Sequence, residues 1–347
     1  MRFSILIPVR DDLPHLVRCL DSLRTQDLSD CEVLVADDGS QPPVAPADLP
    51  VLARPLRLFR LSGDGPAVAR NFLADQAVGD YLFFLDADTE ASPRMLQCAR
   101  SVIAARPGIR SFFGSYDDRP AWPSLISVYR NLLHHHVHQQ SGGREVSTFW
   151  CGCGVIQRDL YRECGGLSEA YRTASIEDLA FGVQLLDRGV LTRIVPELQV
   201  KHLKRWTLGS WLYTDLFRRG IPWVRLMRAR GEWTGQLNFS PSQRMAALSA
   251  VAVVILLVAA PWWPPSALLA SVPLAAFVSL NRDFFRLVAR TRGVPTAIAA
   301  VPLHLAYALI CVLSLVMGFC YPPLKLEYGR RSGLKSPRCA GPVSDSP

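Results

Sequence analysis

Two long stretches of this sequence lack any charged residue: Met245 to Leu280 and Val294 to Tyr321. A helix that crosses a bilayer needs about 20 apolar residues, which span about 30 Å. The second stretch fits one such helix. The first is too long for one helix and has Pro261-Trp262-Trp263-Pro264-Pro265 in its middle. This pattern predicts two short helices hinged at the prolines, or one helix and an interfacial segment. Residues 245–321 are therefore predicted to form two or three membrane spans, with buried helices of a soluble protein as the weaker alternative.

The N-terminus lacks the pattern of a secretory signal peptide. Phe3 to Val9 is too short for the hydrophobic region of such a peptide, and Arg10, Asp11 and Asp12 follow at once. We therefore expect the first 200 residues to stay on the cytoplasmic side of the membrane.

The nine cysteines show no paired C-x-x-C spacing, and Cys151 and Cys153 form one C-x-C without a partner pair. In a domain that faces the cytosol, these two are expected to be small buried side chains. Four histidines lie between positions 134 and 138. His134 and His138 have the i, i+4 spacing of metal ligands, but the spacing places no third ligand. A solvated or membrane-surface helix face is therefore favoured over a metal site.

Net positive charge is confined to the regions that flank the uncharged stretches. Residues 1–199 hold 20 basic and 25 acidic side chains, a net charge of −5. Residues 200–244 hold 9 and 2, net +7, and residues 281–347 hold 9 and 3, net +6. The positive-inside rule and attraction to anionic lipid headgroups predict this distribution. It argues against nucleic acid as a partner, because the basic residues do not decorate the globular part.

Residues 201–244 combine arginine with aromatic side chains, which is typical of a helix in the headgroup layer. The aromatic residues are Trp206, Trp211, Tyr213 and Trp223, and the arginines are Arg218, Arg219, Arg225, Arg228 and Arg230. We predict a basic, interfacial helical segment here, and a basic, disordered tail over residues 322–347.

The orientation of the last apolar stretch stays open at this level. If the basic regions before residue 245 and after residue 281 both lie inside, residues 245–280 form a hairpin. One span over residues 294–321 would then carry the basic tail outside, against the positive-inside rule. Either that stretch re-enters without crossing, or the tail violates the rule.

The first 115 residues alternate between apolar strands and amphipathic helices. The expected strands cover residues 3–9, 31–36, 56–61 and 80–85, and the expected helices cover residues 13–26 and 65–78 and begin again at Ser92-Pro93. This order predicts an α/β fold for residues 1–200, with a mostly parallel sheet flanked by helices.

Three of the expected strands end in acids: Asp11-Asp12, Asp37-Asp38 and Asp86-x-Asp88. Ligands of such sheets bind outside the carboxyl ends of the strands. Capping of the next helix explains Asp12 and Asp38, but Ser92 already provides the cap after the third strand. Residues i and i+2 of an extended chain point the same way. Asp86 and Asp88 could therefore face one Mg²⁺ ion together with substrate phosphates.

The motifs in their order resemble those of the family-two glycosyltransferases. The segments are Ser4-Ile-Leu-Ile-Pro8, Val33-Leu-Val-Ala-Asp-Asp-Gly-Ser40, Gly65-Pro-Ala-Val-Ala-Arg-Asn71, Phe84-Leu-Asp-Ala-Asp88, Gly165-Gly166-Leu167, Ser175-Ile-Glu-Asp-Leu-Ala-Phe-Gly182 and His202-Leu-Lys-Arg-Trp206. The resemblance spans residues 3 to 206. It implies a GT-A (Rossmann-like) domain that transfers a sugar from a nucleotide-sugar donor, with uridine as the usual base.

The resemblance also implies roles for the acids. Asp38 and Asp37 would contact the nucleoside, Asp11 would assist at the base, and Arg70 would face the nucleotide. Asp86 and Asp88 would meet the diphosphate through Mg²⁺ or Mn²⁺, with Asp88 as the direct ligand.

Glu177-Asp178 would supply the catalytic base of an inverting transfer. A carboxylate in a closed cleft can take the proton of an acceptor hydroxyl. Asp178 is the expected base, and Glu177 would support it. The alternative is ordinary: acids at a helix N-terminus also act as caps.

His202-x-x-Arg205-Trp206 departs from the family's Q-x-x-R-W motif, because His replaces Gln. Arg205 would hold the leaving diphosphate, and Trp206 would either stack on a sugar or anchor the chain in the membrane interface. The apolar and basic regions suggest a lipid-linked or polyprenyl acceptor, or a glycan, at the inner membrane of a bacterium.

The prediction is therefore an inverting, metal-dependent membrane glycosyltransferase. A nucleotidyltransferase would also place acids above a nucleotide, but it needs a glycine-rich loop after the first strand, where Val9-Arg-Asp-Asp-Leu-Pro14 has no glycine. A non-catalytic membrane scaffold with a degenerate transferase domain would not need Asp38, Asp88 and Asp178 together.

Overall fold

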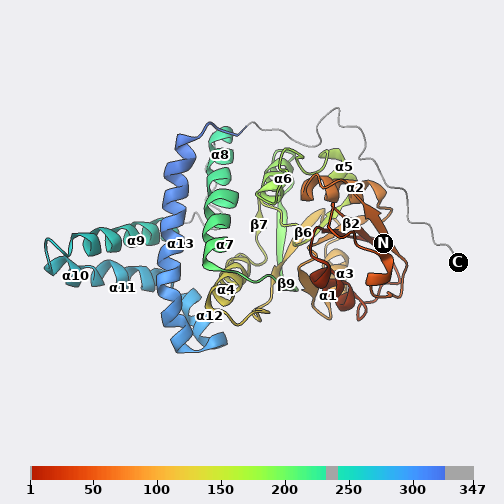
Figure 1. Ribbon diagram of the computed structural model, residues 1–347. Coiled ribbons are helices and arrows are strands. Elements are labelled where there is room, and N and C mark those ends of the chain that lie inside the picture. Colours follow the sequence, from red (N-terminus) through yellow and green to blue (C-terminus); the bar gives the residue numbers. More distant parts are fainter. Residues whose placement is uncertain (1, 232–240, 325–347) are drawn as a thin grey trace. The chain divides into compact units, whose positions relative to one another are not determined.

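The computed structural model describes residues 2–231 and 241–324. These residues fall into two compact units, of which the first comprises residues 2–117 and 141–204 and the second residues 118–140 and 205–324. Residues 118–140, which the predicted boundary at residue 200 leaves in the first domain, fold with the C-terminal helices instead. The helix that they contain, α4 (Leu125–Gln140), packs on two of those helices, α12 and α13. Figure 1 shows the elements of both units.

The first unit is built on one sheet, and its N-terminal half is parallel, as predicted. The strands β1 (Phe3–Val9), β2 (Cys31–Asp37), β3 (Leu56–Arg60) and β4 (Tyr81–Leu85) lie in the order β3-β2-β1-β4. Parallel neighbours require crossover connections. The helices α1 (Leu13–Leu23) and α2 (Pro66–Gln76) supply two of them. The carboxyl ends of β1, β2 and β4 consequently share one edge of the sheet.

The other half of the sheet is mixed rather than mostly parallel. The remaining strands are β5 (Thr89–Ala91), β6 (Ser111–Tyr116), β7 (Glu145–Val146), β8 (Cys153–Gln157) and β9 (Thr192–His202). β8 lies between β4 and β6 and is antiparallel to both, whereas β9 is parallel to β6. The chain leaves this unit after β6 and returns before β8, which then fills the gap in the opposite direction. Local strand patterns contain no signal for such a long-range insertion.

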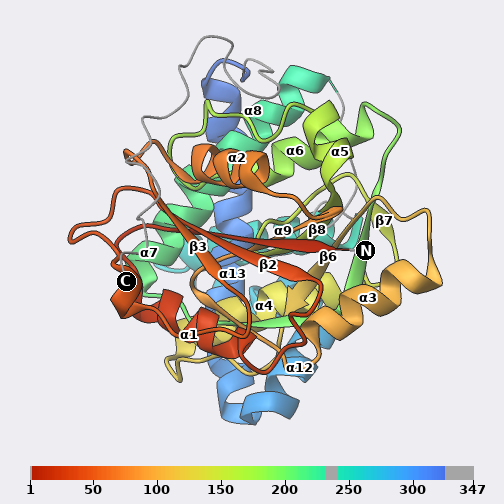
Figure 2. The ribbon, with the colours of Figure 1, turned by 90° about the vertical axis from the view of Figure 1, so that its right-hand side faces the viewer.

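Alternate side chains of the strands enter two different cores, which explains their unbroken apolar runs. The later helices of this unit are α3 (Met95–Ala105), α5 (Arg158–Glu163) and α6 (Glu177–Leu186). Ile5 and Phe83 pack on one face, which α1 and α3 cover, and Leu6 and Phe84 pack on the other, which α2, α5 and α6 cover. Figure 2 shows these two groups of helices on opposite sides of the sheet.

Two predicted helix boundaries move for local reasons. α1 ends before the predicted residue 26, and the side chain of Gln26 donates to the carbonyl oxygen of Ser92 (2.8 Å). The helix predicted to begin at Ser92 begins at Met95. Asp12 precedes α1 but makes no side-chain cap, because its carboxylate pairs with His15 at 2.8 Å.

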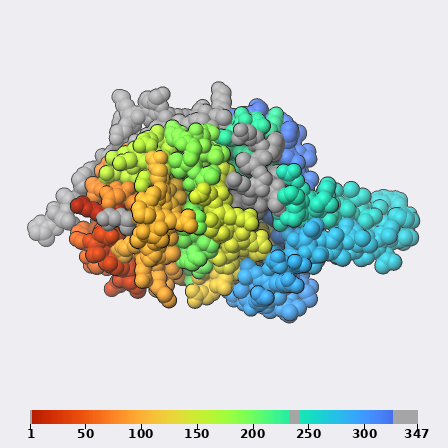
Figure 3. All heavy atoms as spheres, turned by 180° about the vertical axis from the view of Figure 1, so that it is seen from behind, coloured from red at the N-terminus to blue at the C-terminus, as the bar shows by residue number. Residues whose placement is uncertain are grey.

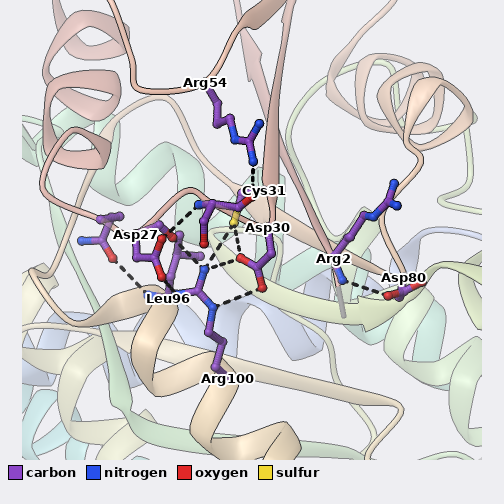
Figure 4. A network of polar contacts seen from close by, with 10 residues as sticks. Arg2, Asp27, Asp30, Cys31, Arg54, Asp80, Leu96 and Arg100 are labelled. Atoms are coloured by element: carbon purple, nitrogen blue, oxygen red, sulfur yellow. Dashed lines mark hydrogen bonds and ion pairs between the residues drawn. The ribbon is translucent and has the colours of Figure 1, made fainter.

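A polar network ties the amino ends of the strands together, at the edge opposite the acids (Figure 4). Arg100 of α3 donates to the carbonyl oxygen of Asp27 (2.7 Å) and pairs with the carboxylate of Asp30 just before β2. Partial burial acts to raise the pKa of Asp30, but the bond to Arg100 outweighs it and lowers that pKa. The backbone N–H of Arg2 donates to Asp80 (2.8 Å), which joins the starts of β1 and β4.

The described residues of the second unit form helices around a core of their own. After α4 these are α7 (Leu208–Tyr213), the π-helical η2 (Thr214–Gly220), α8 (Ile221–Arg230), α9 (Pro241–Ala259), α10 (Pro265–Leu269), α11 (Ser271–Leu280), α12 (Arg282–Arg292) and α13 (Val294–Cys320). The predicted break at the prolines separates α9 from α10, and α11 packs back against α9.

By length and composition, two described helices could cross a membrane. These are α9 and α13, with mean hydropathies of 1.9 and 2.2. Residues 265–280 and α12 would add a third span only as a pair bent by 72°. This agrees with the prediction of two or three candidate spans.

The predicted interfacial segment is only partly at the surface. Trp206 and Trp211 are buried in the helical core, whereas Tyr213 is exposed. A headgroup anchor is therefore the wrong interpretation of Trp206 and Trp211. Residues 232–240 of this segment and residues 325–347 of the predicted tail lie outside the described residues.

The histidines of α4 do not form a solvated face. His135 and His138 are buried, and the rings of His134 and His138 lie 4.3 Å apart. Across residues 2–231 and 241–324, no group of three or more His, Cys, Asp or Glu is arranged to hold a metal ion. Cys151 and Cys153 are buried, free thiols, as predicted.

Gly114 tests the irregular pairing of β6 with β9. The register of these strands shifts between Phe113 and Ser115, and a Cβ on Gly114 would collide with the carbonyl oxygen of Leu198. We expect Gly114→Ala to lower the free energy of unfolding by about 1–3 kcal/mol. Gly108→Ala is the control, because a Cβ there meets nothing within 4 Å. Chemical unfolding of both variants measures the difference, and equal stabilities would contradict this account.

Candidate functional site

The loop after β1 is fastened to the loop after β2. The backbone N–H of Asp11 donates to the hydroxyl of Ser40 (2.8 Å), and the Asp11 carboxylate accepts from the backbone N–H of Gln41 (2.8 Å). Asp11 has φ = 54°, a left-handed conformation that Asp tolerates better than most residues. Asp11 thus lies beside the second acidic loop, as the shared sheet edge requires.

Asp37 supports the loop after β2 from inside. Its carboxylate is buried, accepts from the backbone N–H groups of Ser40 (2.8 Å) and Val44 (2.9 Å), and pairs with Arg60. Although burial acts to raise its pKa, these bonds keep the pKa of Asp37 below the ordinary value. Both carboxylate oxygens are occupied within the protein, so this geometry does not leave Asp37 available to a nucleoside.

Asp38 links the end of β2 to the start of α2. Its two oxygens accept from the backbone N–H groups of Asp64 (3.1 Å) and Gly65 (2.9 Å). Burial raises the pKa of Asp38 in spite of these bonds. The contact requires glycine at position 39, because a Cβ there would collide with the backbone of Gly63.

Arg70 of α2 is the centre of a buried ionic cluster. Its guanidinium contacts Asp86 at 2.7 Å and Glu177 at 3.1 Å, and its side chain is only 8% exposed. Burial acts to lower the pKa of Arg70, but the neighbouring acids outweigh it and raise that pKa further. Burial, Asp88 and Glu177 raise the pKa of Asp86 against the effect of Arg70. Three segments far apart in the sequence therefore meet at one charge.

In an extended chain, Asp86 and Asp88 would point in the same direction. In the structure Asp86 faces Arg70, whereas Asp88 does not. The chain turns after β4, because the backbone N–H and the hydroxyl of Thr89 both donate to the carbonyl oxygen of Asp86 (3.2 and 2.7 Å). The carboxylate of Asp88 faces His202 instead, 3.5 Å from its Nε2 atom. Burial acts to raise the pKa of Asp88, but the charges of His202 and Lys204 lower it.

Asp88 and His202 have the chemistry of a divalent-cation site. Carboxylate suits Mg²⁺ and Mn²⁺, and imidazole is a ligand of transition metals. The side chain of Asp88 is 24% exposed, and the ring of His202 is held by stacking on Tyr116, with centroids 4.3 Å apart. Asp86 is less suited, since it already pairs with Arg70. The two residues fit one ion whose remaining ligands would come from water and substrate.

Asp178 is the second residue of α6 and is partly exposed. One oxygen accepts from the backbone N–H of Leu179 (2.8 Å), and the other lies 3.4 Å from the backbone nitrogen of Cys151. The Cys151 thiol is within electrostatic range of Arg70, Asp86, Glu177 and Asp178, and burial together with the acids raises its pKa. Cys151 thus marks the point where the predicted base and the acids after β4 come together.

Glu177 is turned inward. Besides Arg70, its carboxylate accepts from the backbone N–H of Ser175 (2.8 Å), and the residue is buried. The two adjacent acids therefore differ in environment: Glu177 closes the ionic cluster, and Asp178 remains accessible.

Asn71 is a member of the site that our sequence analysis did not assign a role. Its side-chain nitrogen donates to the carbonyl oxygen of Leu167 and to Glu169 (both 2.9 Å), and its oxygen accepts from Tyr161 (2.6 Å) and from the backbone N–H of Leu167 (2.9 Å). A Cβ on Gly166 would collide with this amide. The signal was present in the sequence, since Asn71 follows Arg70 directly, but its partners are about 95 residues away.

Arg205 and Trp206 belong to the second unit, where each has a partner. The guanidinium of Arg205 stacks on Trp122, and Arg130 lies over the ring of the buried Trp206. The backbone N–H of Trp206 donates to the hydroxyl of Ser127 (2.9 Å). The interactions of Trp206 are those of a core residue.

Arg70→Gln tests the ionic cluster. Removing one partner of a buried ion pair leaves uncompensated charge, so we expect the free energy of unfolding to fall by about 3–5 kcal/mol at neutral pH. The pKa of Asp86, already raised by burial, should rise further. A carboxyl with a raised pKa stabilises the fold when protonated, so the loss should shrink as the pH is lowered. Unfolding curves across pH measure this.

Arg18→Gln is the matched control for that variant. Arg18 pairs with Glu90 at 2.6 Å but is 48% exposed, so its loss should cost less than about 1 kcal/mol. Equal losses in the two variants, or a loss in Arg70→Gln that grows on acidification, would contradict the buried cluster.

Comparison with known proteins identifies this region. Residues 4–165 match the model of glycosyl transferase family 2. An uncharacterized glycosyltransferase of Haemophilus influenzae is 28% identical over 201 residues, which are 54% of this chain and 63% of the relative. The glycosyltransferase EpsJ of Bacillus subtilis is 31% identical over 188 residues, 51% of this chain and 52% of the relative. The chain thus matches less than two thirds of the length of each of these relatives.

The fold has a counterpart of known structure. The mannosyltransferase PcManGT from Pyrobaculum calidifontis, in complex with GDP-Man and Mn²⁺, aligns with a TM-score of 0.51 and 16% identity over 91% of this chain and 87% of that one. This likeness concerns the fold. The family is given by the match over residues 4–165, which form a glycosyl transferase family 2 domain.

Proposed function

We propose that the first unit transfers a sugar from a nucleotide-sugar donor to an acceptor hydroxyl with inversion at the anomeric carbon. The observation that supports this most is the contact of Arg70 with both Asp86 and Glu177, which brings the loop after β4 to the start of α6, where Asp178 lies 3.4 Å from the backbone nitrogen of Cys151. It joins Asp178, a partly exposed residue, to a cluster at the carboxyl ends of the strands, where ligands of such sheets bind.

The donor would be held at the ends of β2 and β4. Asp88, with His202 beside it and Asp86 behind it, would hold Mg²⁺ or Mn²⁺, which neutralises the charge of the departing nucleoside diphosphate. Asp38 and Asp11 lie in interlocked loops at the same edge and would border the nucleoside. The structure of PcManGT holds GDP-Man and Mn²⁺, which supports a nucleotide-sugar donor of some kind. Uridine is the proposed base of this nucleotide.

Asp178 would act as the catalytic base. Its carboxylate takes the proton of the acceptor hydroxyl as the oxygen forms its bond to the anomeric carbon. The bond from that carbon to the donor phosphate breaks, and its electron pair leaves with the nucleoside diphosphate. Glu177 would not take part directly, since it holds Arg70. Arg70 in turn fixes Asp86 and offsets the negative charge that gathers at this edge.

The acceptor would be associated with a membrane. The apolar α9 and α13 and the basic regions on either side of them support a location at anionic lipid headgroups. A lipid-linked or polyprenyl acceptor, or a glycan, at a bacterial inner membrane would meet this requirement.

Asp178→Asn should abolish the base without removing bulk. We expect turnover to fall by about 10²–10⁴-fold while donor binding is retained. Release of nucleoside diphosphate from a panel of nucleotide sugars, in the presence of lipid extract, measures turnover. Asp159→Asn, at a side chain that is 81% exposed, is the control and should be fully active. Unchanged turnover in Asp178→Asn would remove this residue from the mechanism.

Asp88→Asn should remove the metal-dependent part of donor binding. Ligand at about 100 times its dissociation constant stabilises the native protein by about 2.7 kcal/mol. We expect the wild type to show such a thermal shift with its donor and Mn²⁺, and Asp88→Asn to show only the shift seen without metal. Asp21→Asn, on the surface of α1, should behave as the wild type. A full Mn²⁺-dependent shift in Asp88→Asn would place the metal elsewhere.

A further inference from the structure

The hairpin formed by α9, α10 and α11, residues 241–280, exposes apolar side chains along its length. Val258, Leu268 and Val272 are 61%, 78% and 68% exposed, and Trp262 at the tip is 82% exposed. In Figure 3 the hairpin stands away from α12 of the same unit. Exposed apolar side chains gathered on one element indicate a contact with a membrane or a protein.

The helix α13 has the composition of a membrane span, but η2 and α8, which pack against it, do not. η2 and α8 run alongside its C-terminal half in the same direction. Gly220 lies against Ser314, and Val224 lies against Gly318 one turn further on. At the end of α13, Arg228 donates to the carbonyl oxygens of Gly318 (2.9 Å) and Phe319 (3.1 Å).

A bilayer crossed by this half of α13 would therefore also contain η2 and α8. η2 carries Arg218 and Arg219 directly before Gly220, the residue that lies against Ser314 of α13. The side chain of Arg219 is exposed. Charged residues within membrane spans are rare, and they face the protein interior or a water-filled cavity. The arginines near the end of α13 suit its carbonyl groups and a headgroup layer.

The hairpin runs across α13 rather than along it (Figure 1). If the hairpin enters the bilayer parallel to the membrane normal, α13 lies parallel to the membrane surface. The 19 residues of α9 correspond to about 28 Å, close to the thickness of the hydrocarbon layer. Arg282 and Arg286, at the base of the hairpin, are exposed and can meet anionic headgroups.

We propose that the hairpin of residues 241–280 is the element that enters the lipid bilayer, that both of its ends lie on one side, and that α13 rests along the membrane surface without crossing. Gly231 and Tyr321 then lie on the same side of the membrane. This inference goes beyond the proposed reaction and does not depend on it.

Two substitutions of equally exposed residues test which element is embedded. Val258 in the hairpin and Val316 in α13 are 61% and 58% exposed. We expect full-length Val258→Arg to be lost from carbonate-washed bacterial membranes and Val316→Arg to be retained. Leu268→Arg serves as a second hairpin variant should Val258→Arg fail to fold, which circular dichroism in detergent shows. Retention of the folded hairpin variants, or release of Val316→Arg, would overturn the proposal.

The position of the C-terminal end gives an independent measurement. Green fluorescent protein or alkaline phosphatase is fused before Met1 or after Pro347 of the full chain. The proposal requires fluorescence and no phosphatase activity at both ends. Phosphatase activity at the C-terminal end alone would show that α13 crosses the membrane. If Val258→Arg instead turns a detergent-solubilised oligomer into a monomer and stays in washed membranes, a second copy covers the hairpin and the proposal is wrong.

Discussion

The buried charge of Arg70 is the constraint on which the proposed site depends. A guanidinium with little access to water needs counter-charges, and it finds them on the loop after β4 and at the start of α6. These segments are separated by about 90 residues in the sequence. The requirement to neutralise one charge therefore fixes the distance between the loop that bears Asp88 and the helix that bears Asp178. Neither part can move away without leaving a buried ion unpaired.

The paired acids divide their work in a consistent way. Asp86 and Glu177 are bound to Arg70, whereas Asp88 faces His202 and Asp178 lies near the backbone of Cys151. The same division appears after β2, where Asp37 holds its own loop and Asp38 links that loop to α2. In the pairs Asp86/Asp88 and Glu177/Asp178, the acid that is bound to Arg70 fixes the position of the other acid and contributes to its electrostatic environment. An acidic doublet can thus serve architecture and chemistry at once.

The two uncharged stretches of the sequence have different surroundings in the fold. In the hairpin the apolar helices pack mainly on each other and expose the rest of their surface, whereas α13 lies beside helices that carry arginine. Hydropathy alone treats these stretches alike. The physical difference lies in the neighbouring helices, because helices that are packed together enter a membrane as a group.

The sequence by itself determined the α/β class, the parallel half of the sheet, the acids at its carboxyl edge and the break in the first apolar stretch. These follow from local periodicity and from the conformational limits of proline and glycine. Only the tertiary structure decided that β8 enters the sheet antiparallel, that Asp86 turns to Arg70 while Asp88 turns to His202, and that Trp206 is a core residue. Each of these depends on a partner far along the chain, such as Glu177 for Arg70 or Leu167 for Asn71. Local residue preferences do not contain the identity of such partners; burial and charge neutralisation select them when the chain folds.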